Sequence, residues 1–367
     1  MRTFQCSCRN PVFFDNSQCL ACGKELGFCP VCQNLVDLRP DERNAFRCGN
    51  PGCGTGLLKC DNYALHNVCN RCVPESAGEG ALCDCCRFND TIPDLSVPGN
   101  LQKWGRLEAA KRRLFYDLCL LSLPYGQTAD QIDPPLTFDF KADIVPDHRS
   151  WRSIGRSEKV FTGHANGRIT INIREADDVE REKARISFGE AQRTLIGHFR
   201  HEIGHYYWDQ LVKGRREEEC RTIFGDHDNP SYADAIETYY QQGPPADWPT
   251  RFISAYAAMH PWEDFAETWA TYLDMVSTLD TMNNLQSDAG LPHDAPIEQL
   301  VARYQKLGVL LNEINRGVGL LDVVPEVFVP PVIEKLRFIQ HLVELGRAEN
   351  GAIGGTPGAV LQSASPA

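Results

Sequence analysis

Apolar residues recur with a helical period in five stretches of the chain. In the first stretch they stand three, four or seven residues apart and stop before Pro124, at Leu101, Trp104, Leu107, Leu114, Leu118 and Leu121. This pattern predicts a helix with one buried face. Further helices are expected over residues 188–212, 262–279, 297–314 and 331–345.

Two shorter stretches alternate apolar and polar residues, which is the period of a strand with one buried face. They span residues 136–140 and 168–173, and the dipeptide Asn166-Gly167 before the second stretch is a turn signal. Together with the helices, they predict an α+β fold that is mainly helical between residues 100 and 347.

The first 90 residues have a different character, because they hold short apolar pieces, many Cys, Asn and Gly residues, and no long helical period. Residues 91–100 form a connector punctuated by Pro and Gly. After Asn350 the chain is mostly Gly, Ala, Ser and Pro, which predicts disorder. We therefore expect a cysteine-rich module over 1–90, a helical domain over 100–347 and a disordered tail over 348–367.

Charge and hydropathy exclude two classes of partner. The net charge is −12, from 37 basic and 49 acidic residues, and no basic stripe accompanies the cysteines. Nucleic acid is therefore not an expected partner of the whole chain, since phosphate contacts need clustered Lys and Arg. No apolar run reaches 18 residues and no secretory signal is visible, so we expect a cytoplasmic protein that makes no membrane contact.

Cysteines are the most informative part of the composition, because 14 of the 16 lie between Cys6 and Cys86. Without a sign of secretion, paired cysteines at this density predict zinc ligands rather than disulfides. Structural zinc takes four such ligands. Three sets are expected to hold about three zinc ions: Cys6, Cys8, Cys19 and Cys22; Cys29, Cys32, Cys48 and Cys53; and Cys60, Cys69, Cys83 and Cys86. Cys72, Cys85 and His66 compete for places in the third set.

Two interpretations of this module are compatible. In one, zinc replaces the hydrophobic core that so small a module cannot build. The module should then unfold without metal, while the helical domain keeps its own core. In the other, the module also presents a recognition surface for protein or nucleic acid.

The strongest motif is His201-Glu202-Ile203-Gly204-His205, an H-E-x-x-H pattern inside the helix expected over 188–212. Residues four apart share a helix face, so both imidazoles can bind one zinc ion. Glu202 can hold the attacking water as general base. The pattern therefore predicts one catalytic zinc ion.

A catalytic zinc ion needs a third protein ligand and an open fourth position. Trp208 and Leu211 stand where the metzincin pattern has Gly and His, which excludes that class. Glu263 and Glu267 lie four apart on the helix expected over 262–279. One of them can ligate zinc while the other accepts a hydrogen bond from a ligating His.

These motifs resemble the gluzincin metallopeptidases, and more closely a bacterial family of zinc-binding metallopeptidases that begin with zinc ribbons. The likeness covers nearly the whole chain and is carried by the cysteine-rich start and by residues 86–95, 200–208, 254–257 and 262–269. It implies a zincin-like domain in which His201, His205 and Glu263 bind zinc. It also implies that Glu202 is the base and that Glu267 supports a ligand.

The Glu-Asp-Phe-Ala-Glu run over 263–267 resembles the third-ligand helix of anthrax lethal factor, where a Tyr seven residues earlier is placed to stabilise the oxyanion. Tyr256 stands at that position here, and His260 is the competing candidate. The thiols of Cys72 and Cys85 depart from the family pattern, which leaves the third ribbon set open.

The predicted function is hydrolysis of peptide bonds in a peptide or protein substrate by a zinc-activated water. Two rival hypotheses remain. One is a non-catalytic zinc-ribbon adaptor that binds protein or nucleic acid, and the other is a peptidase fold that holds metal without activity. The sequence names no substrate, no preference between endo- and exo-cleavage, and no oligomeric state.

Overall fold

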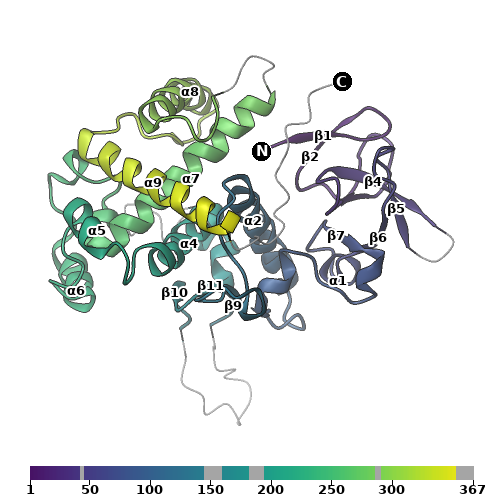
Figure 1. Ribbon diagram of the computed structural model, residues 1–367, viewed down its shortest axis with the longest axis horizontal. Helices are drawn as coiled ribbons and strands as arrows, with labels where there is room; N and C mark the ends of the chain where they lie inside the picture. The colour runs from purple at the N-terminus through teal and green to yellow at the C-terminus, as the bar shows by residue number, and fades with distance from the viewer. Residues whose placement is uncertain (42–44, 144–158, 182–193, 286–290, 353–367) are drawn as a thin grey trace, which may run out of the picture.

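A computed structural model describes residues 1–41, 45–143, 159–181, 194–285 and 291–352 (Figure 1). The strand-rich first part of the chain lies on one side of the molecule and most of the helices lie on the other. This is the α+β architecture expected from the sequence, a cysteine-rich region followed by a mainly helical domain. Within the described residues, no helix is long and apolar enough to cross a membrane.

The strands of the cysteine-rich region are short, and the turns between them carry the cysteine pairs. The first two strands, β1 (Thr3–Gln5) and β2 (Pro11–Phe13), form an antiparallel pair. Five more form an antiparallel meander in chain order: β3 (Leu26–Phe28), β4 (Leu35–Pro40), β5 (Phe46–Cys48), β6 (Gly56–Lys59) and β7 (Cys72–Pro74). The one-turn helix α1 (Asp61–Ala64) lies between β6 and β7.

A second sheet begins the helical part of the fold. Its order is β10-β11-β9-β8, with β8 (Asn89–Thr91), β9 (Thr137–Lys141), β10 (Gly163–Ala165) and β11 (Arg168–Asn172). Strand β9 runs parallel to both neighbours, while β10 and β11 form a hairpin. Asn166 and Gly167 turn this hairpin with φ values of 48° and 80°, as a type I′ turn requires. Both predicted strands and the predicted turn are confirmed.

The helices are α2 (Asn100–Leu120), α4 (Leu195–Leu211), α5 (Glu217–Phe224), α6 (Tyr232–Gln242), α7 (Pro261–Leu285), α8 (Ile297–Gly317) and α9 (Pro330–Ala352). The helices expected around 101–121, 262–279, 297–314 and 331–345 are confirmed. For the one expected over 188–212, residues 188–193 lie outside the described residues. The helices α5 and α6 were not predicted. Residues 348–352 of the predicted tail belong to α9, and 353–367 lie outside the described residues.

One hydrophobic core runs from the cysteine-rich region into the helical domain. Its buried side chains include Cys83 of the third cysteine set, Phe88 shortly after it in the chain, Leu107 on α2 and Val343 on α9. This differs from the expectation that the helical domain has a core of its own. The division at residue 90 also falls inside β8, which pairs with β9 of the second sheet. The cysteine-rich region and the helical domain are therefore joined in two ways, by a common hydrophobic core and by the pairing of β8 with β9.

Candidate metal centres and active-site cleft

Helices α4 and α7 pack against each other and carry the residues predicted to act at the catalytic zinc ion. At this contact the buried ring of Tyr207 on α4 stacks on the buried ring of Trp269 on α7, with centroids 4.7 Å apart. Thr194 caps the start of α4 by accepting a hydrogen bond from the backbone N–H of Gly197 at 3.0 Å. The helical period of the sequence therefore sets which face of α4 meets α7.

Gly204 allows the two helices to approach closely. A Cβ atom at this position would lie 3.0 Å from the Cα of Ala266 and 3.1 Å from the Cβ of Trp269. We expect Gly204→Ala to cost about 1–3 kcal/mol of stability, because α4 and α7 must move apart. The same movement separates His205 from Glu263, so the affinity for zinc should fall as well. Denaturant unfolding and zinc titration measure the two effects.

Gly105 in α2 provides the matched control. A Cβ atom there would meet nothing closer than the Cγ1 of Val68 at 3.6 Å, an ordinary contact. Gly105→Ala should therefore leave zinc binding unchanged and raise stability by about 0.5–1 kcal/mol through helix propensity. If both substitutions change stability equally, close packing at Gly204 is not what the site requires.

The side chains of His201, His205 and Glu263 converge where α4 meets α7. The Nε2 of His201 lies 3.1 Å from the Nε2 of His205 and 2.9 Å from the Oε2 of Glu263. The Nε2 of His205 lies 3.6 Å from that same oxygen. Ligand atoms about 2.0–2.1 Å from a tetrahedral zinc ion stand about 3.3 Å apart, so these three atoms have the spacing of one tetrahedral face. The donor set fits zinc and leaves a fourth position.

Side-chain contacts hold His201 and Glu263 in place. Glu267 lies 2.7 Å from the Nδ1 of His201 and accepts a hydrogen bond from the hydroxyl of Ser254 at 2.8 Å. The hydroxyl of Tyr232 donates to the Oε1 of Glu263 at 2.8 Å. Burial opposes ionisation of Glu263, yet the imidazoles of His205 and His201 hold its pKa well below the usual value. The carboxylate is thus ionised and oriented, with Oε2 pointing to the two imidazoles.

Glu202 lies beside this group at the wall of a large cavity. The carboxyl is buried, and its Oε2 has no hydrogen-bond partner among the described residues. Burial raises the pKa of Glu202 to about 7. Glu202, His201 and Glu267 all line a cavity of about 730 Å³. A carboxyl that titrates near neutral pH can accept a proton and return it.

The two residues predicted to stabilise an oxyanion lie in different surroundings. Tyr256 lines the cavity, with its ring 6.0 Å from that of His201. Burial raises the pKa of Tyr256, so the phenol keeps its proton and can donate it in a hydrogen bond. His260 is buried, and its Nδ1 accepts a hydrogen bond from the backbone N–H of Trp262 at 3.1 Å. Through this hydrogen bond His260 stabilises the first turn of α7.

Some residues at the cleft were not found from the sequence. Tyr232 lies 31 positions before the carboxylate it contacts, and no local pattern connects the two. Ser254 was part of the family likeness but received no role. His198 could have been predicted to lie at the site, because it stands one helical turn before His201 on the same helix. It lines the cavity, and its Nδ1 lies 3.1 Å from the carboxylate of Glu175.

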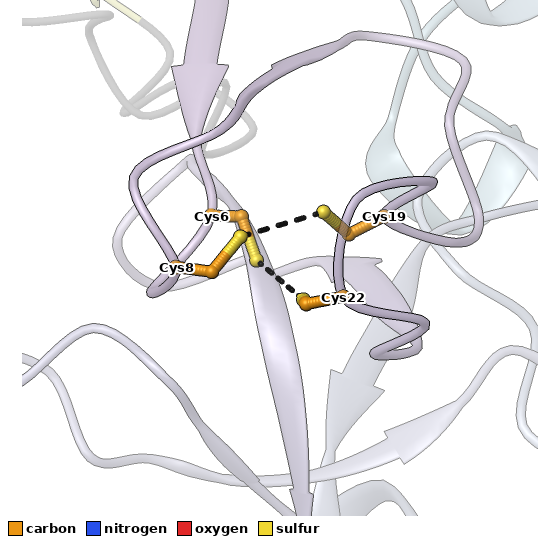
Figure 2. Close-up of side chains that lie close together, drawn as sticks. All are labelled: Cys6, Cys8, Cys19 and Cys22. Carbon is orange, nitrogen blue, oxygen red and sulfur yellow. Dashed lines mark hydrogen bonds between the residues drawn. The ribbon is translucent and has the colours of Figure 1, made fainter.

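The three predicted cysteine sets each come together as a group of four. In the first, the sulfur of Cys6 lies 3.7 Å from that of Cys22, and Cys8 lies 3.7 Å from Cys19 (Figure 2). The sulfur pairs measured in the other two groups are 3.7 to 3.9 Å apart. Thiolates about 2.3 Å from a tetrahedral zinc ion stand about 3.8 Å apart, whereas a disulfide would bring them to about 2.05 Å. The spacing fits zinc.

The third group is the most deeply buried. Its members Cys60, Cys69, Cys83 and Cys86 are all buried and lie within 4.8 Å of one another. Cys72 and Cys85 are buried outside the group, and the ring of His66 packs on Trp104 at 5.6 Å. Geometry therefore separates the favoured four from the three competing residues.

The chain matches two families whose descriptions name zinc. Residues 100–342 match the family described as "Putative zinc-binding metallo-peptidase", and residues 3–97 match a family described as a zinc-ribbon domain. Three relatives, each named only "Uncharacterized protein", come from Mycobacterium bovis and two strains of Mycobacterium tuberculosis. Each is 36% identical over 357 residues, covering 94% of this chain and 96% of the relative. No solved structure matches the chain. The chain belongs to the family described as "Putative zinc-binding metallo-peptidase" and begins with a zinc-ribbon domain.

Proposed function

We propose that this protein hydrolyses peptide bonds with one zinc ion held by His201, His205 and Glu263. The observation that carries the proposal is the tetrahedral spacing of these three donor atoms beside the buried carboxyl of Glu202, at the wall of the 730 Å³ cavity. A third ligand from a Glu on a later helix makes the site gluzincin-like.

Each residue has a distinct part in the reaction. Zinc at this position supplies a Lewis acid that polarises the scissile carbonyl and acidifies a water molecule. Glu202 accepts the proton of the attacking water and delivers it to the leaving amine. Tyr256 donates a hydrogen bond to the oxyanion, a contribution of about 2.7–4 kcal/mol in other hydrolases. Glu267 fixes the orientation of His201 through Nδ1.

The cysteine groups complete the proposal as three structural zinc sites in residues 1–90, with residues 100–347 as the catalytic part. Four thiolates close the coordination of each ion, so these ions are held for structure. Thiolate ligands persist in a reducing compartment, so the proposal places the protein in the cytoplasm. A peptide or protein is the substrate in this scheme.

A peptide library tests the activity. Zinc-loaded protein is expected to cleave some members, as read by mass spectrometry, and a chelator followed by added zinc should abolish and then restore cleavage. Native mass spectrometry should find three tightly held zinc ions and one that exchanges readily. If the protein binds four ions and cleaves no peptide, the non-catalytic zinc-ribbon adaptor becomes the better explanation.

Substitution of the two carboxylates on α7 distinguishes ligand from support. Glu263→Gln should weaken zinc binding strongly, because an amide is a poorer ligand than a carboxylate. Glu267→Gln should cost roughly 10–100-fold in zinc affinity or activity, as for other groups that orient a ligating His. Zinc titration by competition with a chromogenic chelator measures both.

Glu218→Gln serves as the control for these two variants, because the Glu218 side chain is 97% exposed and lies outside the cavity lining. It should bind zinc as the unmodified protein does. If Glu267→Gln removes the catalytic zinc ion and Glu263→Gln leaves it bound, the roles of the two carboxylates are reversed.

A further inference from the structure

Helix α8 has two apolar faces where a surface helix normally has one. The inner face packs on the rest of the domain through Leu300, Tyr304 and Gly308, all of them buried. The outer face of its second half is also apolar, since Val309, Leu310 and Ile314 are each more than half exposed. The helix lies at the edge of the helical domain (Figure 1).

The connection from α8 to α9 carries further exposed apolar side chains. It runs back along the helix, where the side chain of Asn312 donates to the backbone oxygen of Val324 at 2.9 Å. The side chains that form the exposed surface, here called the α8 patch, are Val309, Leu310, Ile314, Val318, Leu320, Leu321, Val323 and Val327, each 48% to 69% exposed. They present roughly 500 Å² of apolar surface, at about 100 Å² for a fully exposed aliphatic side chain.

That area equals what one copy contributes to a stable homodimer. A standard interface buries about 800 Å² per partner, and homodimer interfaces are about 65% apolar, which gives roughly 500 Å². A polar border is also present. Arg316 pairs with Asp322 and with Glu326 at the edge of the patch, the latter at 2.8 Å.

The charges on α8 identify the partner as a second copy. When two identical helices pack antiparallel about a two-fold axis, residues equidistant from the axis face each other. An axis between Val309 and Leu310 puts Lys306 of each copy opposite Glu313 of the other, because both stand at the same distance from that centre. Lys306 and Glu313 are both exposed, and Lys306 has no ion pair among the described residues. Glu313 pairs at 2.7 Å with Arg316 of its own copy, and in the dimer it would also face Lys306 of the second copy. The apolar centre is thus flanked by two complementary pairs.

We propose that the protein forms a homodimer through the α8 patch, with α8 packed antiparallel on α8 of the second copy. Burial of the apolar side chains supplies the association energy, and the two Lys306–Glu313 pairs set the orientation. The proposal is independent of the proposed peptidase activity, because it uses no residue of the zinc site.

Sedimentation velocity and light scattering test the dimer on the full zinc-loaded protein. A dimer is expected at micromolar concentration. Leu310→Asp should raise its dissociation constant at least ~10²-fold, because two carboxylates would face each other at the axis. Leu65→Asp, at a leucine of the cysteine-rich region that is 68% exposed against 56% for Leu310, should leave the dimer intact. A monomer at all concentrations, or a dimer that Leu310→Asp does not weaken, overturns the proposal.

Exchange of the charges at positions 306 and 313 tests the antiparallel orientation of the two α8 helices. Lys306→Glu alone should weaken the dimer, and Lys306→Glu with Glu313→Lys should restore it, since each copy then offers the reversed pair. A circular dichroism spectrum checks that the variants keep their helices. A protein that stays monomeric and uses the α8 patch to bind lipid vesicles or a different protein contradicts the proposal.

Discussion

Replacing Glu202 with Gln is expected to lower peptide hydrolysis by at least ~10²-fold while zinc remains bound. The amide keeps the size of the side chain but cannot accept the proton of the attacking water. The three donor atoms of the metal site belong to His201, His205 and Glu263, so zinc content should not change. Initial cleavage rates and zinc content per chain are measured on the same preparation.

The control for this experiment lies on the same helix. Asp209 on α4 is partly exposed, and Asp209→Asn should keep the cleavage rate of the unmodified protein, because this residue lies outside the cavity lining. Full activity of Glu202→Gln would show that another group acts as the base. Loss of zinc from Glu202→Gln would show that this carboxyl contributes to metal binding.

Replacing Cys69 with Ser is expected to unfold much of the protein, including helices far from the cysteines in sequence. A hydroxyl is a poor zinc ligand, and structural zinc in small modules binds with about 10–16 kcal/mol. That is comparable to the total stability of a domain, about 5–15 kcal/mol. The third cysteine group lies in the same core as α2, so its collapse removes support from both regions.

Buried contacts connect the third cysteine group to α2, so loss of its zinc ion should destabilise that helix. The sulfur of Cys86 lies 4.0 Å from the carboxylate of Glu108, which forms a fully buried ion pair with Lys111 at 3.0 Å. Arg112, also on α2 and buried, donates to the backbone oxygen of Val68 at 2.7 Å, next to Cys69. Loss of the ion would leave these buried charges with altered partners, which is costly.

Cys22→Ser is the matched comparison, because Cys22 belongs to the first group and is exposed. It should lose one zinc ion and leave the helix signal at 222 nm and its melting temperature nearly unchanged. If Cys69→Ser is too unstable to isolate, chelation of the unmodified protein should show helix loss together with release of the most slowly exchanging ion. Equal melting of both variants contradicts a coupled core.

Local sequence signals predicted the elements that carry the chemistry. The period of α4 places His201 and His205 on one face, and the four-residue spacing of Glu263 and Glu267 places both on one side of α7. The cysteine spacings predicted three groups of four that the structure brings together. In each case, a short repeat or a regular helix determines which side chains are neighbours, so the chain alone contains the information.

Features that depend on long-range packing could not be predicted in this way. Tyr232 reaches Glu263 because the start of α6 packs on the start of α7, where its ring lies 5.6 Å from that of Trp262, and no spacing in the chain indicates this. The shared core was missed because the cysteine-rich segment looks self-contained, while its burial against α2 depends on tertiary contacts. The apolar residues of α8 follow an ordinary helical period in the sequence. Only the exposed fractions of their side chains in the structure show that those on the outer face are not buried.

Strand β8 makes the order of the two regions hard to change during evolution. It begins three residues after Cys86 and pairs with β9, so one short stretch both follows the third metal site and covers an edge of the second sheet. Separation of the two regions would leave the edge of β9 that faces β8 without a partner strand, and exposed strand edges promote aggregation. A helical domain separated from the cysteine-rich region would therefore need another strand to cover this edge of the second sheet.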